Sequence, residues 1–178
     1  MIETYRMIAG RIRAELKELD QVVARITHIW QQVEDQEGID QPADLNHQGG
    51  DYHSRLGYQV DAVALNLHGF YTGVEHVLDV IARGVDQAKP SGEAWHKELL
   101  LQMTAQIPDV RPPVLRRETR AQLDRYRGFR HVVRNVYTYR LDPAQIALLI
   151  QQLPTTFESV SNDLLAFADW LEHIAKAG

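Results

Sequence analysis

The sequence of 178 residues contains no cysteine and no long uninterrupted run of apolar residues. Without cysteine the chain can form neither disulfide bonds nor thiolate metal sites, and this composition is compatible with a reducing compartment. The first segment, residues 1–18, intersperses charged residues among the apolar ones, so we expect neither a secretory signal nor a membrane span. These absences together predict a soluble cytoplasmic protein.

Sustained alternation of apolar and polar residues, which is typical of strands, is also missing, whereas apolar residues recur at helical spacing almost everywhere. The sequence therefore predicts an all-α fold, and its length suits a single domain over residues 1–178. The predicted helices cover residues 3–35, 51–87, 92–106, 115–138 and 143–174. We also expect Ser91 to cap the third helix and Pro154 to kink or divide the fifth.

Positive charge is concentrated in one part of an otherwise acidic chain. The net charge is −5, yet residues 111–140 contain nine arginines against two acids, Glu118 and Asp124. This segment therefore carries +7, and the remaining residues carry −12. A local basic surface can attract a phosphate-bearing ligand even on an acidic protein, because electrostatic contacts act over a short range. A solvated helix face is the alternative explanation of this charge.

The predicted fourth helix separates its apolar residues from its cationic ones. Phe129, Val132, Val133 and Val136 share one side when the helix is drawn at about 100° per residue. The opposite side carries Arg120, Asp124, Arg127, Arg130, His131, Arg134 and Asn135. Arginine dominates this side, and its planar guanidinium group suits phosphate oxygens, so the pattern favours an anion site.

Arg130, Asn135 and Tyr137 follow one another at a spacing that resembles a known signature. In HepT-type toxins with a HEPN domain, an arginine, four further residues, a histidine, one further residue and a tyrosine lie near the end of a helix. The segments at residues 66–82, 95–103, 111–113 and 129–135 are similar to those proteins as well. The resemblance covers about residues 55–175, and it implies a HEPN-type helical bundle of about five helices that forms a homodimer.

Members of this family act as endoribonucleases that need no metal or other cofactor, so the resemblance implies that RNA is the substrate. Arg130 would hold the scissile phosphate and residue 135 would transfer protons, because cleavage through the 2′-hydroxyl needs acid–base help and cationic stabilisation. Arg127, His131 and Arg134 would guide RNA or support the cleft, to which each protomer of the dimer contributes one copy of the motif.

The chain departs from the signature at residue 135, where asparagine replaces the expected histidine. An amide forms hydrogen bonds but cannot take up and return a proton near neutral pH, so the chain as written should cleave RNA feebly or not at all. Three explanations remain open. Asn135 is a substitution introduced to disarm a toxin, or a natural member lost cleavage and kept binding, or His131 takes the proton-transfer role with Arg125 or Arg127 upstream.

Tyr137 is the residue that the resemblance assigns to regulation. In this family a nucleotidyltransferase antitoxin of the MntA type adds AMP to the tyrosine after the motif, which would place bulk and negative charge in the cationic cleft. Tyr139 is a nearby competitor, and packing of Tyr137 at the rim of the bundle is the alternative. Two other functions remain: a non-catalytic helical module that binds RNA or the nucleotidyltransferase, and a structural dimer that docks an acidic partner.

Other histidine and carboxylate residues give weaker signals. Glu93 and His96 have the Glu-x-x-His spacing of di-metal bundles, but a second such pair is missing. We therefore interpret His96 as part of the packing around the short third helix. His47 and His53 flank a glycine-rich loop without matching a metal motif, so the sequence predicts no metal site.

Overall fold

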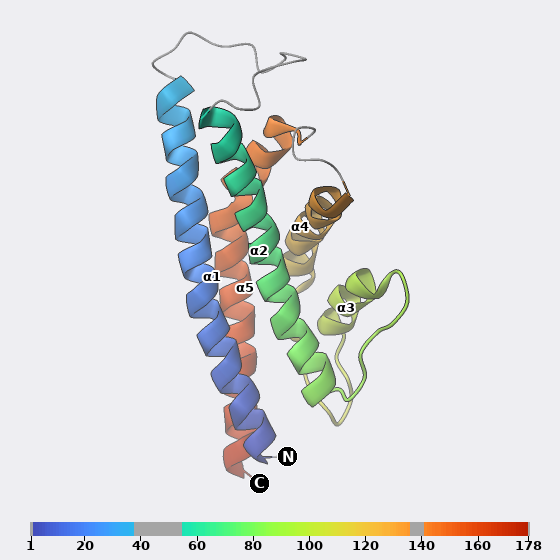
Figure 1. The fold of residues 1–178 in the computed structure, drawn as a ribbon. Helices are drawn as coiled ribbons and strands as arrows, with labels where there is room; N and C mark the ends of the chain where they lie inside the picture. The colour runs from blue at the N-terminus through green and yellow to red at the C-terminus, as the bar shows by residue number, and fades with distance from the viewer. Residues whose placement is uncertain (1, 38–54, 136–140, 178) are drawn as a thin grey trace.

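The computed structural model describes residues 2–37, 55–135 and 141–177. These residues form five helices and the segments that connect them (Figure 1). They are α1 (Ile2–Glu37), α2 (Arg55–Gly84), α3 (Trp95–Thr104), α4 (Arg117–Asn135) and α5 (Pro143–Ala177). Among these residues, strand-type pairing is limited to one isolated bridge between Ile107 and Arg111. The predicted all-α fold is confirmed. None of the described helices is long and apolar enough to cross a membrane.

One local expectation about the helices was wrong, and one of two alternatives for another is excluded. Ala94 occupies the N-cap position of α3 without a side-chain hydrogen bond, so Ser91 is not the cap. Gly92 lies between Ser91 and Ala94 with a φ of 90°, a left-handed conformation that favours glycine. The helix α3 begins after it, at Trp95. Pro154 lies inside α5 and does not divide it, and Leu153 and Thr156 on either side of it are buried in the core. The alternative that Pro154 kinks the helix stays a prediction.

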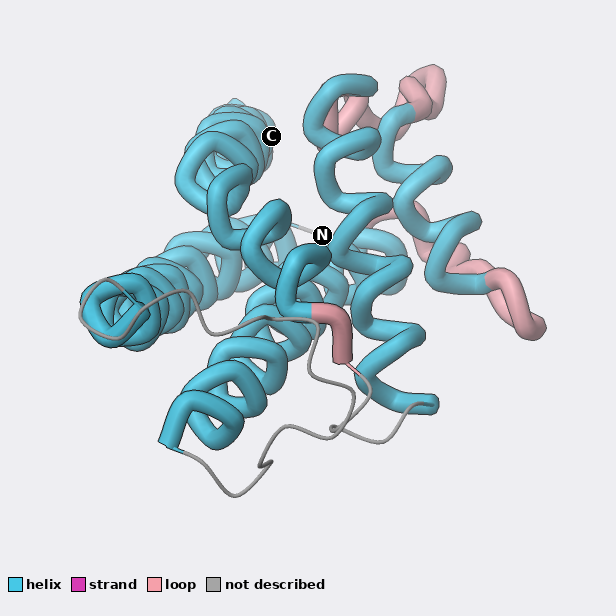
Figure 2. Tube along the Cα trace, turned by 90° about the horizontal axis from the view of Figure 1, so that it is seen from above, coloured by secondary structure: helices cyan, strands magenta, loops and turns pink. Residues whose placement is uncertain are grey.

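The long helices α1, α2 and α5 form a bundle, and α3 and α4 lie on one side of it (Figure 1). Figure 2 shows the described residues from above, with helix as the dominant structure and no strand. α1 runs antiparallel to α2 and α5, so the two ends of the chain lie at the same end of the bundle. There the Arg6 guanidinium donates a hydrogen bond of 3.3 Å to the carbonyl oxygen of Ala175.

Close packing of α1 on α2 depends on two glycines. A Cβ atom at Gly84 would lie 2.6 Å from Ile8 Cδ1, and one at Gly73 would lie 2.8 Å from Leu19 Cδ2. Both leucine and isoleucine are buried, so their side chains fill the space that the glycines leave open. The bundle is thus a tightly interlocked core on which the shorter helices can dock.

An aromatic anchor fixes α4 against this core. The ring of Tyr126 is buried and lies edge-to-face with Phe70 of α2, with 5.3 Å between the ring centroids. Its hydroxyl donates a hydrogen bond of 2.8 Å to the carbonyl oxygen of Leu149 in α5, and burial raises the pKa of Tyr126 to about 12. Phe129 is buried on the same side of α4. This docking determines the directions in which the arginines of α4 project.

Arg111 holds the proline-rich connection between α3 and α4 in place. Its side chain is fully buried and pairs with Asp86, which follows α2, at 2.5 and 2.7 Å. The guanidinium also donates to the carbonyl oxygens of Gln102, Ala105 and Pro112. Every donor direction of the buried cation is therefore used, and the end of α3 is tied to the end of α2.

Replacing Arg111 with alanine should destabilise the fold strongly. The substitution leaves the buried Asp86 carboxylate without its cation, which typically costs about 3–5 kcal/mol. Chemical denaturation followed by circular dichroism would measure the loss. Arg13→Ala is the matched control, because Arg13 forms exposed ion pairs with Asp169 and Glu172 that should contribute about 0–1 kcal/mol. Equal losses for the two variants would contradict a structural role for Arg111.

Candidate functional site

Glu75, His96 and Arg130 meet where α2, α3 and α4 come together. His96 Nδ1 lies 2.5 Å from Glu75 Oε1, and His96 Nε2 lies 3.2 Å from Arg130 Nη1. Arg130 Nη2 completes the contact at 3.6 Å from Glu75 Oε2. Only 7%, 18% and 15% of the Glu75, His96 and Arg130 side chains are exposed. These residues, distant in sequence, form one largely buried group that we call the Glu75–His96–Arg130 cluster.

The start of α3 places His96 in this cluster. The rings of Trp95 and His96 lie face to face, with centroids 3.6 Å apart and planes inclined by 31°. Lys89 in turn lies over the Trp95 ring, with its Nζ atom 4.2 Å from the ring centroid. Together with the hydrogen bond to Glu75, this stacking restricts the orientation of the imidazole.

Glu75 is a buried carboxylate that receives several donors. Tyr71 lies one turn earlier on α2, close to this carboxylate. Burial raises the pKa of the Tyr71 hydroxyl, and the neighbouring Glu75 charge raises it further. Tyr71, His96 and Arg130 therefore surround the carboxylate, which offsets the cost of removing it from water. Both carboxylate oxygens of Glu75 have a partner in the cluster. The buried Nε atom of Arg130 has no hydrogen-bond partner among the described residues.

The cationic character of the cluster extends to the exposed side of α4. Burial lowers the pKa of His68 on α2, and the charges of Arg130 and Arg134 lower it further, against a smaller opposing effect of Glu75. Arg134 is exposed and forms no ion pair with the other described residues. Arg127 is half-buried and pairs with Asp124 at 2.7 Å. The positive field of Arg130 and Arg134 thus acts over α2 as well as along α4.

The local charge of +7 overstates the positive field of residues 111–140, because the fold supplies acids from other segments. Three arginines of this segment form ion pairs with acids outside it: Arg111 with Asp86, Arg116 with Asp163, and Arg130 with Glu75. Within the described part of the chain, Arg117, Arg120 and Arg134 form no ion pair. Part of the positive charge of residues 111–140 is therefore neutralised by acids from other segments.

The predicted site residues differ in what the structure reveals about them. Arg130 lies in the Glu75–His96–Arg130 cluster, while Arg127 and Arg134 lie near it on α4 and His131 is exposed on the same helix. Asn135 is the last residue of α4, and its side chain lies outside the described residues, as does all of Tyr137. The predicted juxtaposition of Arg130 with residues 135 and 137 thus stays a prediction.

Sequence reasoning missed Glu75, and it predicted packing for His96 without the bond to Glu75. Packing explains only part of the position of His96, since its ring is bonded to Glu75 as well as stacked on Trp95. Glu93, the other half of the Glu-x-x-His spacing, is exposed. No group of three or more histidine, aspartate or glutamate side chains in residues 2–37, 55–135 and 141–177 could hold a metal ion. The signal that could have identified the cluster is a histidine beside a tryptophan at the start of a short helix.

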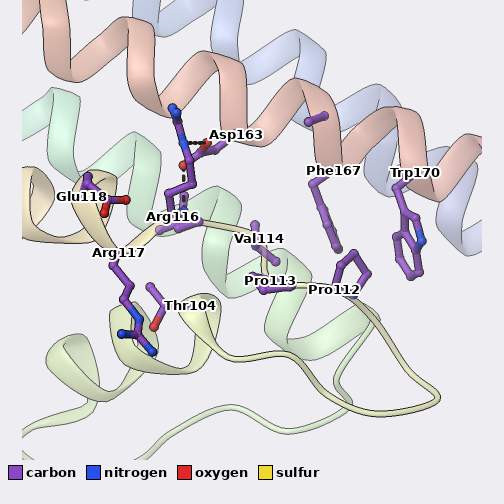
Figure 3. A pocket seen from close by; sticks show the side chains of 12 residues that line it. Thr104, Pro112, Pro113, Val114, Arg116, Arg117, Glu118, Asp163, Phe167 and Trp170 are labelled. Atoms are coloured by element: carbon purple, nitrogen blue, oxygen red, sulfur yellow. Dashed lines mark hydrogen bonds and ion pairs between the residues drawn. The ribbon is translucent and has the colours of Figure 1, made fainter.

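A cavity of about 680 Å³ lies elsewhere, between the α3–α4 connection and α5 (Figure 3). Pro112 and Pro113 face Phe167 and Trp170 across it, while Arg116 donates hydrogen bonds of 2.6 and 2.9 Å to Asp163. None of the residues that line it belongs to the Glu75–His96–Arg130 cluster. This cavity is therefore separate from the cationic site.

A sequence model of the family described as HepT-like protein matches residues 62–171, which is more than half of the chain. The matched span contains all three residues of the cluster. Searches of curated proteins and of solved structures find no significant match.

Proposed function

The chain belongs to the HepT-like protein family, and from that premise we propose that it is an endoribonuclease toxin of a type VII toxin–antitoxin pair. The observation that carries the proposal is the position of Arg130. A buried carboxylate and an imidazole hold its guanidinium group beside an exposed arginine of the same helix. Such a preorganised cation suits a phosphate group that gains negative charge during a reaction.

The proposed reaction cleaves RNA through its own 2′-hydroxyl group and needs no metal. Arg130 binds the scissile phosphate and stabilises the charge of the transition state, while residue 135 occupies the acid–base position. Arg127, His131 and Arg134 guide the RNA backbone or support the site. A homodimer places two copies of α4 in one cleft and so doubles the cationic groups around the strand.

Asn135 lowers the activity of this chain, because an amide cannot exchange a proton as imidazole does. The same residue favours a second candidate function, a non-catalytic HEPN module that binds RNA or a nucleotidyltransferase partner. Both candidates use the arginines of α4, and they differ in whether a histidine at residue 135 is sufficient to restore cleavage.

Regulation by a MntA-like nucleotidyltransferase antitoxin is the second part of the proposal. Transfer of AMP to Tyr137 adds a negatively charged group two residues after the acid–base position. The adduct would compete with RNA phosphate for the arginines of α4 and would also occupy space in the cleft. Toxin and antitoxin are both expected in the cytoplasm.

Asn135→His should restore metal-independent RNA cleavage. A positioned proton-transfer group commonly contributes about 10²- to 10⁴-fold in rate, so the variant should exceed the original chain by a factor in this range. The measurement uses a folded RNA in the presence of EDTA and single-turnover conditions. Adding Arg130→Gln to the restored chain should abolish cleavage, since glutamine is polar but lacks the positive charge.

Arg117→Gln is the matched control for Arg130→Gln, because Arg117 is an exposed arginine at the opposite end of α4. It should leave cleavage by the restored chain unchanged. A restored chain that binds RNA but never cuts it would contradict the nuclease proposal and would favour the non-catalytic module.

Tyr137→Phe should prevent AMP transfer by a MntA-like nucleotidyltransferase supplied with ATP. Phenylalanine keeps the ring but lacks the hydroxyl that would accept the nucleotide. Mass spectrometry of the intact chain would report the adduct, and Tyr139→Phe is the matched control that should still be modified. Undiminished modification of the Tyr137→Phe chain would exclude Tyr137 as the acceptor.

A further inference from the structure

His96 is a histidine in direct contact with the arginine that we assign to the scissile phosphate. Its Nε2 atom lies 3.2 Å from Arg130 Nη1, and its Nδ1 atom lies 2.5 Å from Glu75 Oε1. The ring is neither fully buried nor fully open, since 18% of the side chain is exposed. A proton-transfer group is therefore already present at this site, on a helix other than the one that carries the Arg130–Asn135 motif.

The contacts on the two sides of the imidazole fix which nitrogen carries the proton. Arginine offers only donors, so Nε2 must accept a hydrogen bond from Arg130 through its lone pair. Nδ1 must then carry the hydrogen and donate it to the Glu75 carboxylate. The unprotonated nitrogen, the one able to act as a base, is thus directed at the guanidinium group where phosphate would bind.

The surroundings of Glu75 support more than a packing role for this histidine. A buried carboxylate that accepts a hydrogen bond from Nδ1 orients an imidazole and stabilises the imidazolium that forms when Nε2 takes a proton. Trp95 covers one face of the ring and limits its rotation.

We propose that His96 is the general base of the ribonuclease site, with Glu75 as the carboxylate that orients it. This inference rests on the proposed function, and it assigns the acid to residue 135. The bound phosphate first takes over the Arg130 N–H and so releases the lone pair of His96 Nε2. His96 Nε2 then takes the proton of the 2′-hydroxyl, the 2′ oxygen forms a bond to phosphorus, and the bond from phosphorus to the 5′ oxygen breaks. The 5′ oxygen leaves with the electron pair and takes a proton from a histidine at residue 135, or from water where residue 135 is asparagine.

This division of roles predicts two different pH profiles. Cleavage by the Asn135→His chain should depend on pH in a bell shape, because one imidazole must be neutral and another protonated. The original chain should cleave slowly, and its rate should rise with pH to a plateau without a falling limb, since water replaces the acid. Both profiles should contain the rising limb that belongs to His96.

His96→Gln in the Asn135→His background tests the assignment directly. Glutamine can donate to Glu75 and accept from Arg130, so it preserves positioning but cannot transfer a proton. Single-turnover cleavage of an end-labelled RNA hairpin in EDTA should slow by about 10²- to 10⁴-fold and lose the rising limb, while RNA affinity stays nearly unchanged. His76→Gln is the control that should alter neither rate nor profile, because His76 is exposed on α2 and bonded to Arg11.

Glu75→Gln provides a second, independent variant, and it decides the question if the His96→Gln chain does not fold. It keeps the histidine and removes the charge, so the rising limb should move to lower pH, because an amide stabilises imidazolium less than a carboxylate does. An unchanged limb in this variant would overturn the role of His96.

The remaining outcomes separate the two proposals. Cleavage by Asn135→His that survives His96→Gln with an unaltered pH profile would overturn the role of His96 and leave the nuclease function standing. A slower rate with the same profile would reduce His96 to a positioning residue and would also overturn the proposal. Absence of cleavage in the Asn135→His chain would overturn the nuclease function and the role of His96 together.

Discussion

The buried carboxylate of Glu75 is the constraint on which the candidate site depends. A charge that is removed from water needs compensation, and His96 on α3 and Arg130 on α4 provide it. The carboxylate is satisfied only when α3 and α4 have docked on α2. Formation of the site therefore requires the docked helices, and the orientation of Arg130 follows from their packing.

Two contacts outside the site set the geometry that Glu75 requires. Tyr126 anchors α4 between Phe70 and the backbone of α5, so that Arg130 projects towards α2. The buried pair between Arg111 and Asp86 ties the end of α3 to the end of α2 and thereby places the Trp95–His96 segment. The arginines of residues 111–140 thus have distinct structural tasks, and only part of them contributes to an open cationic surface.

The fold was predictable because helical spacing is a local property, and over the described residues the predicted helices differ from the observed ones by only a few residues at their ends. The predicted helical residues 51–54 and 136–138 lie outside the described residues. The side of α4 that carries Phe129 was equally readable, since burial follows amphipathic periodicity. The cluster was not, because Glu75 and His96 reach Arg130 only through tertiary packing over 55 and 34 positions of sequence. Asp86, Asp163 and Glu75 also lie outside residues 111–140, so counting the charges of that segment could not identify them as partners of its arginines.

The central claim is that Glu75 and Arg130 fix His96 as a base directed at the phosphate position. Two-bond correlation spectra between the imidazole nitrogens and carbon-bound protons of the ¹⁵N-labelled chain would identify the tautomer directly. The account predicts a neutral His96 ring that carries its proton on Nδ1 and has a lone pair on Nε2. A ring protonated at Nε2 would contradict the account, because that nitrogen could not accept a hydrogen bond from Arg130 or take a proton from RNA.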